Sequence, residues 1–97
     1  MFEIRFAGGA IADLKLLKKG LRRSVLSEIE AMLINHPAME TRNRKKLRPN
    51  KLAEWELRFG NFRVFYDVDQ DASLIRIQAV GYKTGSRLII EGKEYKL

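Results

Sequence analysis

The feature that most constrains the fold is the segment 54–66, in which two runs of alternating apolar and polar residues flank a Gly60-Asn61 pair. Gly and Asn tolerate the positive φ that a two-residue hairpin loop requires. The segment therefore predicts a β-hairpin, and its short loop fixes the register so that Arg58 lies directly opposite Arg63. Two arginines then share one face of a sheet.

Opposed like charges on neighbouring strands are destabilising, by about 0.2–1 kcal/mol. The planar guanidinium is well suited to bind phosphate, because it offers paired donors. The Arg58–Arg63 pair is therefore a candidate phosphate site. Two other interpretations remain open: both guanidiniums point into water, or Glu56, on the same strand face as Arg58, neutralises them.

The composition describes a small basic protein that forms a single domain over residues 1–97, with a net charge of +7. There is no cysteine, which excludes disulfides and thiolate zinc sites, and one histidine, His36, cannot form a histidine-pair nuclease site. No segment approaches the roughly 20 apolar residues of a membrane span, so we expect no membrane partner and a cytoplasmic location. The charge favours a polyanionic partner.

Five cations gather in seven residues just before the hairpin, within an expected basic loop over residues 38–53 that has room for a helical turn. We consider them candidate nucleic-acid contacts, although a solvated loop would look the same. They are Arg42, Arg44, Lys45, Lys46 and Arg48.

The remaining patterns predict an α+β fold. A strand over residues 2–6 precedes a helix from Ala10 to Lys18, which Gly20 ends, and a second helix from about Leu21 to Asn35. After the hairpin, strands are expected over residues 74–82 and 87–90. The predicted architecture is an N-terminal strand and a two-helix hairpin packed on one face of an antiparallel sheet of about four strands.

The faces of the strand over residues 74–82 follow from simple alternation. Ile75, Ile77 and Ala79 should then face the helices. Arg76, Gln78 and Val80 should lie on the face of the arginine pair, where we consider Arg76 and Gln78 further candidate contacts to a nucleic acid. Phe65 is also expected on this face, as a side chain on which a base could stack.

Three segments, 46–48, 55–66 and 79–83, resemble the toxins of the RelE/ParE superfamily of type II toxin–antitoxin pairs, and the likeness covers essentially the whole chain. The resemblance implies an endoribonuclease that cuts messenger RNA, in many members within the ribosomal decoding site. It also implies a cognate antitoxin, for which we expect an amphipathic helix lying across the helical hairpin or the sheet edge.

The family's hairpin arginine falls on Arg63, and its cation after the glycine falls on Lys83. Of the family's basic positions in the preceding strand, Arg58 keeps the charge, whereas Glu56 reverses it. The C-terminal tyrosine of some members falls on Ile89. Tyr82 or Tyr95 could replace that tyrosine.

The chemistry that this resemblance implies needs neither metal nor cofactor, because the 2′-hydroxyl of the RNA attacks the adjacent phosphate. We assign Arg58, Arg63 and Lys83 to that phosphate. Glu56 lies about 6.6–7 Å along the strand from Arg58 and is placed to take the hydroxyl proton. Tyr82 is the candidate acid for the leaving oxygen.

Other interpretations stay open at this point. Glu56 could simply form a salt bridge worth at most about 1 kcal/mol, and Lys83 could be an ordinary lysine at a strand end. A ParE-like toxin that inhibits DNA gyrase without nuclease activity shares the fold. So does an inactive member that binds only nucleic acid or its antitoxin.

Overall fold

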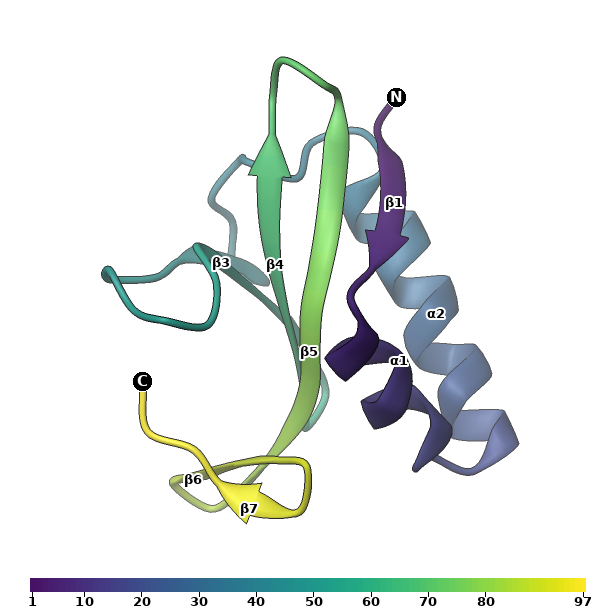
Figure 1. Cartoon of the computed structure of the whole chain (residues 1–97), viewed down its shortest axis with the longest axis vertical. Helices are drawn as coiled ribbons and strands as arrows, with labels where there is room; N and C mark the ends of the chain where they lie inside the picture. The colour runs from purple at the N-terminus through teal and green to yellow at the C-terminus, as the bar shows by residue number, and fades with distance from the viewer.

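The computed structural model describes residues 1–97 and confirms the α+β fold, with two helices packed on one face of a sheet (Figure 1). The sheet has seven strands in the order β2-β3-β4-β5-β6-β7, and β1 pairs in parallel with β5. The helices are α1 (Gly8–Lys15) and α2 (Lys19–Leu33). The strands are β1 (Glu3–Phe6), β2 (Arg44–Lys46), β3 (Trp55–Phe59), β4 (Phe62–Asp69), β5 (Leu74–Thr84), β6 (Arg87–Ile90) and β7 (Lys93–Glu94).

The β3–β4 hairpin has the predicted register. Arg58 lies opposite Arg63, and Gly60 adopts a positive φ of 55° in the two-residue turn. A side chain at residue 60 would be strained in this conformation, whereas glycine adopts it readily. The hairpin therefore sets the two arginines side by side, as the sequence predicts.

The helix boundaries differ from the expected ones. α1 begins at Gly8 and ends at Lys15, and α2 begins at Lys19, so that Gly20 lies inside the first turn of α2 and ends no helix. Lys18 is extended, with φ −61° and ψ 149°, and it makes the break between the helices. The prediction that Gly20 terminates the first helix is wrong, because the chain turns two residues earlier. Neither helix is long and apolar enough to cross a membrane.

The expected basic loop contains a short strand, β2, that pairs with β3 in antiparallel fashion. Thr41 N–H donates to Arg44 O at 2.9 Å, and Leu47 N–H donates to Glu54 O at 2.8 Å, which fixes both ends of β2. Three consecutive cations carry no apolar alternation, so the sequence pattern could not reveal this edge strand.

A β-bulge interrupts β5. Phe65 of β4 lies opposite Ala79, but Tyr66 lies opposite Ile77, so Gln78 has no partner on β4. The extra residue shifts the alternation by one position. As a result Val80 joins the core under the helices and Ala79 faces the other way, which reverses the faces predicted for these two residues.

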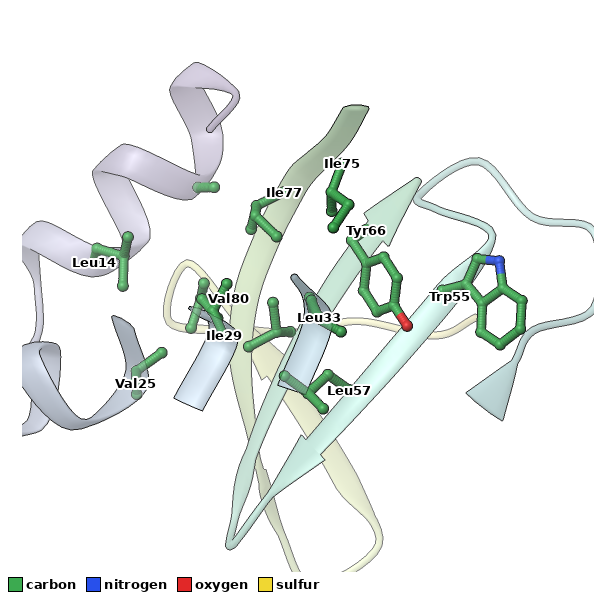
Figure 2. Close-up of a cluster of buried hydrophobic side chains, with 12 residues drawn as sticks. Leu14, Val25, Ile29, Leu33, Trp55, Leu57, Tyr66, Ile75, Ile77 and Val80 are labelled. Carbon is green, nitrogen blue, oxygen red and sulfur yellow. The ribbon is translucent and has the colours of Figure 1, made fainter. Parts of the chain in front are cut away.

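The main core lies between the helices and the sheet, and Figure 2 shows its side chains converging from both layers. Trp55 and Tyr66 stack there with ring centroids 6.2 Å apart. The Tyr66 hydroxyl donates to Pro37 O at 2.7 Å, which ties the segment after α2 to β4. Twelve buried residues form this main core: Ala10, Leu14, Val25, Ile29, Leu33, Trp55, Leu57, Val64, Tyr66, Ile75, Ile77 and Val80.

A smaller core occupies part of the opposite face. Its buried members are Ala53, Phe65, Ala79, Leu88 and Ile90. Leu47 and Leu52 from the segment before β3, and Tyr95 from the end of the chain, pack against it. These two segments lie on the side of the sheet away from the helices (Figure 1). The face opposite the helices is therefore only partly open.

Candidate functional site

The open part of this face carries a cluster of charges that come from four adjacent strands, β2 to β5. Lys45 on β2 lies opposite Glu56 on β3, and Arg58 on β3 lies opposite Arg63 on β4. Arg63 lies opposite Gly81 on β5, so Lys83, two residues further along β5, points to the same face. The structure thus brings together four cations and one carboxylate, which we call the cation cluster: Lys45, Glu56, Arg58, Arg63 and Lys83.

Glu56 is the buried member of the cation cluster, with only 5% of its side chain exposed. Arg58 Nε donates to Glu56 Oε1 at 2.9 Å, and the Arg58 side chain is 48% exposed. A buried carboxylate requires a partner, and Arg58 provides one. The Glu56–Arg58 salt bridge that the sequence left open is therefore present, and Glu56 Oε2 remains without a protein donor.

Arg63 is held rigidly by its own hairpin. Its Nη1 donates to Gly60 O at 2.9 Å and to Phe62 O at 2.8 Å. Its Nε is buried and has no hydrogen-bond partner. Burial lowers the pKa of the Arg63 guanidinium, the charge of Glu56 opposes this shift, and the charge of Arg58 adds to it. Nη2 forms no hydrogen bond within the protein and is not buried, so it is the nitrogen of Arg63 that can donate to an anion.

Gly81 allows the end of β5 to lie close to β6. A Cβ at residue 81 would be 2.5 Å from Ile89 O and 2.8 Å from Ile90 Cγ1, so any side chain would push β6 away. With glycine at this position, Lys83 pairs with Leu88 on β6. The close approach keeps Lys83 beside the smaller core and the cation cluster.

A pocket of about 290 Å³ adjoins the cation cluster. Glu56 and Lys83 form one side of it, and the segment 94–97 forms another. Tyr95 lines this pocket, and its backbone N–H donates to Leu88 O at 2.8 Å. Tyr95 is therefore the tyrosine that shares a pocket with the Glu56 carboxylate. Its place at the end of the chain, after β7, gave no sequence signal for this position.

Tyr82 does not lie where the sequence placed it. It is opposite Phe62 on the helix-covered side of the sheet and is 43% exposed beside the stacked Phe59–Phe62 pair. The bulge in β5 causes this change, because it exchanges the faces of the residues that follow Gln78. Ile89, where the family tyrosine falls, is buried and pairs with Tyr82.

Three of the expected RNA contacts are not part of the cation cluster, one because it is buried and two because they lie away from it. Phe65 is completely buried in the smaller core, so it cannot stack on a base. Arg76 and Gln78 lie at the far end of the face beside Asp67, which accepts from Gln78 Nε2 at 3.0 Å. Asp67 is four residues from Arg63 on β4, about 13 Å along the strand.

The cations before the hairpin divide into two groups. Arg44 points to the helix-covered face of the sheet, where its Nη1 donates to Met32 O at 2.7 Å and its Nε donates to Met39 O at 3.0 Å. It stabilises the carbonyl end of α2 and is unavailable for RNA. The others are exposed and form no salt bridge: Arg42, Lys45, Lys46 and Arg48.

Comparison with known families identifies the chain. Residues 4–85 match the family described as the ParE toxin of the type II toxin–antitoxin system parDE. The chain belongs to this toxin family. It is thus a member of the RelE/ParE-type superfamily, as its hairpin and strand ends suggested. No curated protein sequence matches it.

Solved structures share the fold. The RelBE toxin–antitoxin complex of Mycobacterium tuberculosis matches with a TM-score of 0.73 and 24% identity, over 84% of this chain and 98% of that one. The isolated E. coli RelE toxin matches with a TM-score of 0.69 and 16% identity, over 87% and 86% of the two chains. The YoeB–YefM complex of Staphylococcus aureus matches with a TM-score of 0.63 and 20% identity, over 87% of this chain and 99% of that one.

Proposed function

We propose that this toxin is an endoribonuclease that cleaves messenger RNA on the ribosome, in the cytoplasm, without a metal or cofactor. The observation that carries the proposal is the arrangement of the cation cluster. A buried carboxylate, Glu56, lines a pocket together with Lys83 and is paired with the half-exposed Arg58, and the hairpin carbonyls orient the nearby Arg63 guanidinium. A base surrounded by phosphate-binding cations is what RNA cleavage through the 2′-hydroxyl requires.

The roles follow from the contacts of each residue. Glu56 Oε1 accepts from Arg58, which leaves Oε2 to take the proton of the 2′-hydroxyl. The 2′-oxygen then attacks phosphorus, and the bond to the 5′-oxygen breaks. Arg63 and Arg58 stabilise the charge on the phosphoryl oxygens, with Lys83 assisting. Tyr95 replaces Tyr82 as the donor of a proton to the leaving 5′-oxygen, because it lines the pocket with Glu56.

A second candidate function is favoured by the family match itself. The matching family is that of the ParE toxins, and a ParE-like toxin that inhibits DNA gyrase needs no nuclease chemistry. Such a protein would have no use for a buried glutamate surrounded by cations, which is why we place the nuclease first. A third interpretation is an inactive member of the family that binds only nucleic acid or antitoxin.

The test compares induced expression of the wild type, Arg63→Ala and Arg76→Ala in a bacterium. Arg76 is a matched control, because it is an exposed arginine at the far end of the same face. We expect growth arrest and new messenger RNA 5′ ends with the wild type and Arg76→Ala, and neither with Arg63→Ala. Growth arrest by the wild type with inhibited DNA supercoiling and no new messenger RNA 5′ ends would support gyrase inhibition. No growth arrest by the wild type would support an inactive binding protein.

The proposed antitoxin partner has a candidate docking groove. Phe2, Ile4 and Phe6 of β1 and Leu26 and Ile29 of α2 line an apolar groove of about 390 Å³, at the strand that pairs along one edge only. Toxins of this fold are found bound to antitoxins. We propose that an amphipathic antitoxin helix places its apolar face in this groove. Leu26→Asp should weaken co-purification with the cognate antitoxin, and Arg23→Asp, on the exposed face of α2, should not.

A further inference from the structure

A buried aspartate in α1 contacts the strand that carries Lys83. Asp13 is only 5% exposed, and its Oδ2 accepts from the Val80 N–H at 2.9 Å across 67 residues of sequence. Its Oδ1 is buried without a partner. Burial raises the pKa of Asp13, the hydrogen bond from Val80 opposes the shift, and the charge of Glu91 adds to it. The mechanism proposed above gives this carboxylate no task.

Asp13 fills a gap at one edge of β5. On this edge β1 pairs with β5 as far as Ile77, β6 begins to pair at Tyr82 and lies against Gly81, so residues 78–80 have no neighbouring strand. α1 begins at this gap, where Ala7 N–H donates to Ile77 O at 2.9 Å. An unpaired backbone N–H is costly when buried, and Asp13 satisfies the one at Val80.

The bulge at Gln78 lies inside the same gap, and it decides which side chains reach the cation cluster. With the bulge, Gly81 lies opposite Arg63 and Lys83 follows on the same face. Without it, the alternation set by Ile77 would continue. Tyr82 would then face the arginines, and Lys83 would point to the helix side. A shift of one residue in register would therefore put Tyr82 in place of Lys83 on the face of the arginines.

We infer that Asp13 is a positioning residue: by holding Val80 it maintains the bulge that places Lys83 on the face of Arg58 and Arg63. The expected effect on RNA binding rests on the proposed function. The positioning of β5 rests on the Asp13–Val80 contact alone. Asp13 touches no substrate in this account. It acts through the backbone of β5.

The test uses a double-mutant cycle. Asp13→Leu removes the acceptor and keeps the branched shape and number of heavy atoms, Asp13→Asn keeps an oxygen for Val80, and Val25→Ala is a control that weakens the main core elsewhere. Each is made alone and with Lys83→Ala. Affinity for a fluorescein-labelled 20-nucleotide single-stranded RNA is measured at constant salt, with hydrogen exchange of the Val80 amide by NMR and thermal unfolding in parallel.

We expect Asp13→Leu to weaken RNA binding about tenfold, which corresponds to the loss of one charged hydrogen bond. We also expect the Val80 amide to exchange faster than the change in global stability alone would cause. Combined with Lys83→Ala, Asp13→Leu should weaken binding no further. Asp13→Asn should bind within about twofold of the wild type. Val25→Ala should lower the melting temperature and leave the affinity of the folded protein unchanged. If Asp13→Leu does not fold, Asp13→Ala carries the same expectation.

Independent, multiplying losses from Asp13→Leu and Lys83→Ala would overturn the inference, as would unchanged Val80 exchange in Asp13→Leu. A folded Asp13→Asn variant that loses RNA binding would also overturn it. Failure of the proposed function looks different: wild type and Arg63→Ala would then bind the RNA equally weakly. Val80 exchange would still show whether Asp13 protects the Val80 amide.

Discussion

The two faces of the sheet bury apolar residues in different ways. On one face two helices cover a continuous core of twelve buried residues. On the other, two short segments cover five buried residues and leave the cation cluster beside them. The same strands supply both faces, because successive side chains point to opposite sides. A small domain can thus use one face for stability and divide the other between stability and chemistry.

The largest effect should come from the carboxylate of the cation cluster. Glu56→Gln keeps the shape of the side chain but removes the proposed base, so the RNA cleavage rate should fall by about 10²–10⁴-fold. RNA affinity should not weaken, since a negative charge is lost. The matched control is Glu54→Gln, two residues earlier and exposed, with cleavage assayed in a translating extract. Cleavage at the wild-type rate by Glu56→Gln would show that the base lies elsewhere.

A second prediction compares the two cores directly. Leu57 and Phe65 are both completely buried, on opposite faces. Leu57→Ala should lower the free energy of unfolding by about 2–5 kcal/mol, and Phe65→Ala by about 3–5 kcal/mol, as measured by urea denaturation. If Phe65→Ala weakened RNA binding with no loss of stability, Phe65 would be a stacking side chain after all.

The hydroxyl of Tyr66 offers a smaller test on the helix-covered face. Tyr66→Phe leaves the buried Pro37 carbonyl without its donor and should cost about 1–3 kcal/mol of unfolding free energy, without changing RNA cleavage. Tyr82→Phe is the exposed control and should stay within about 0.5 kcal/mol of the wild type. Equal stability of the two variants would contradict the role of the Tyr66–Pro37 hydrogen bond.

The smallest effect is a pH dependence at Asp13. Because its pKa is raised in the folded state above 3.8, the folded protein holds this proton more tightly than the unfolded chain. The stability from Asp13 is therefore complete below pH 3.8 and is lost as the pH rises through the folded pKa. Urea denaturation at a series of pH values should show the wild type losing stability relative to Asp13→Asn as the pH rises. A constant or increasing difference would contradict this.

The hairpin and the bulge also differ in how far the sequence predicts them. The register of β3 and β4 follows from the Gly60-Asn61 turn and the alternation on either side, which are local features. The bulge in β5 depends on Asp13, 65 residues before Gln78, and no local pattern marks it. The faces predicted after Gln78 are therefore wrong, and Tyr95, not Tyr82, lines the pocket that contains Glu56.

Charged residues were also harder to place than apolar ones. From the sequence, Arg44 cannot be told apart from the other cations of the basic loop. In the structure, Arg44 donates to the carbonyls of Met32 and Met39. A lone Asp13 in the apolar stripe of α1 was the available signal for a buried polar contact. Only the fold shows which backbone group such a side chain meets. Arg58, Arg63, Glu56 and Lys83, by contrast, share the expected face.

The most direct test of the central claim is cleavage of messenger RNA on purified programmed ribosomes by the wild type, Arg63→Ala and Arg76→Ala. We predict fragments that end in a 2′,3′-cyclic phosphate and begin with a 5′-hydroxyl. The rate should be at least about 10²-fold lower for Arg63→Ala and unchanged for Arg76→Ala. No cleavage by the wild type, or equal cleavage by the wild type and Arg63→Ala, would contradict an RNA-cleaving site built around Arg63.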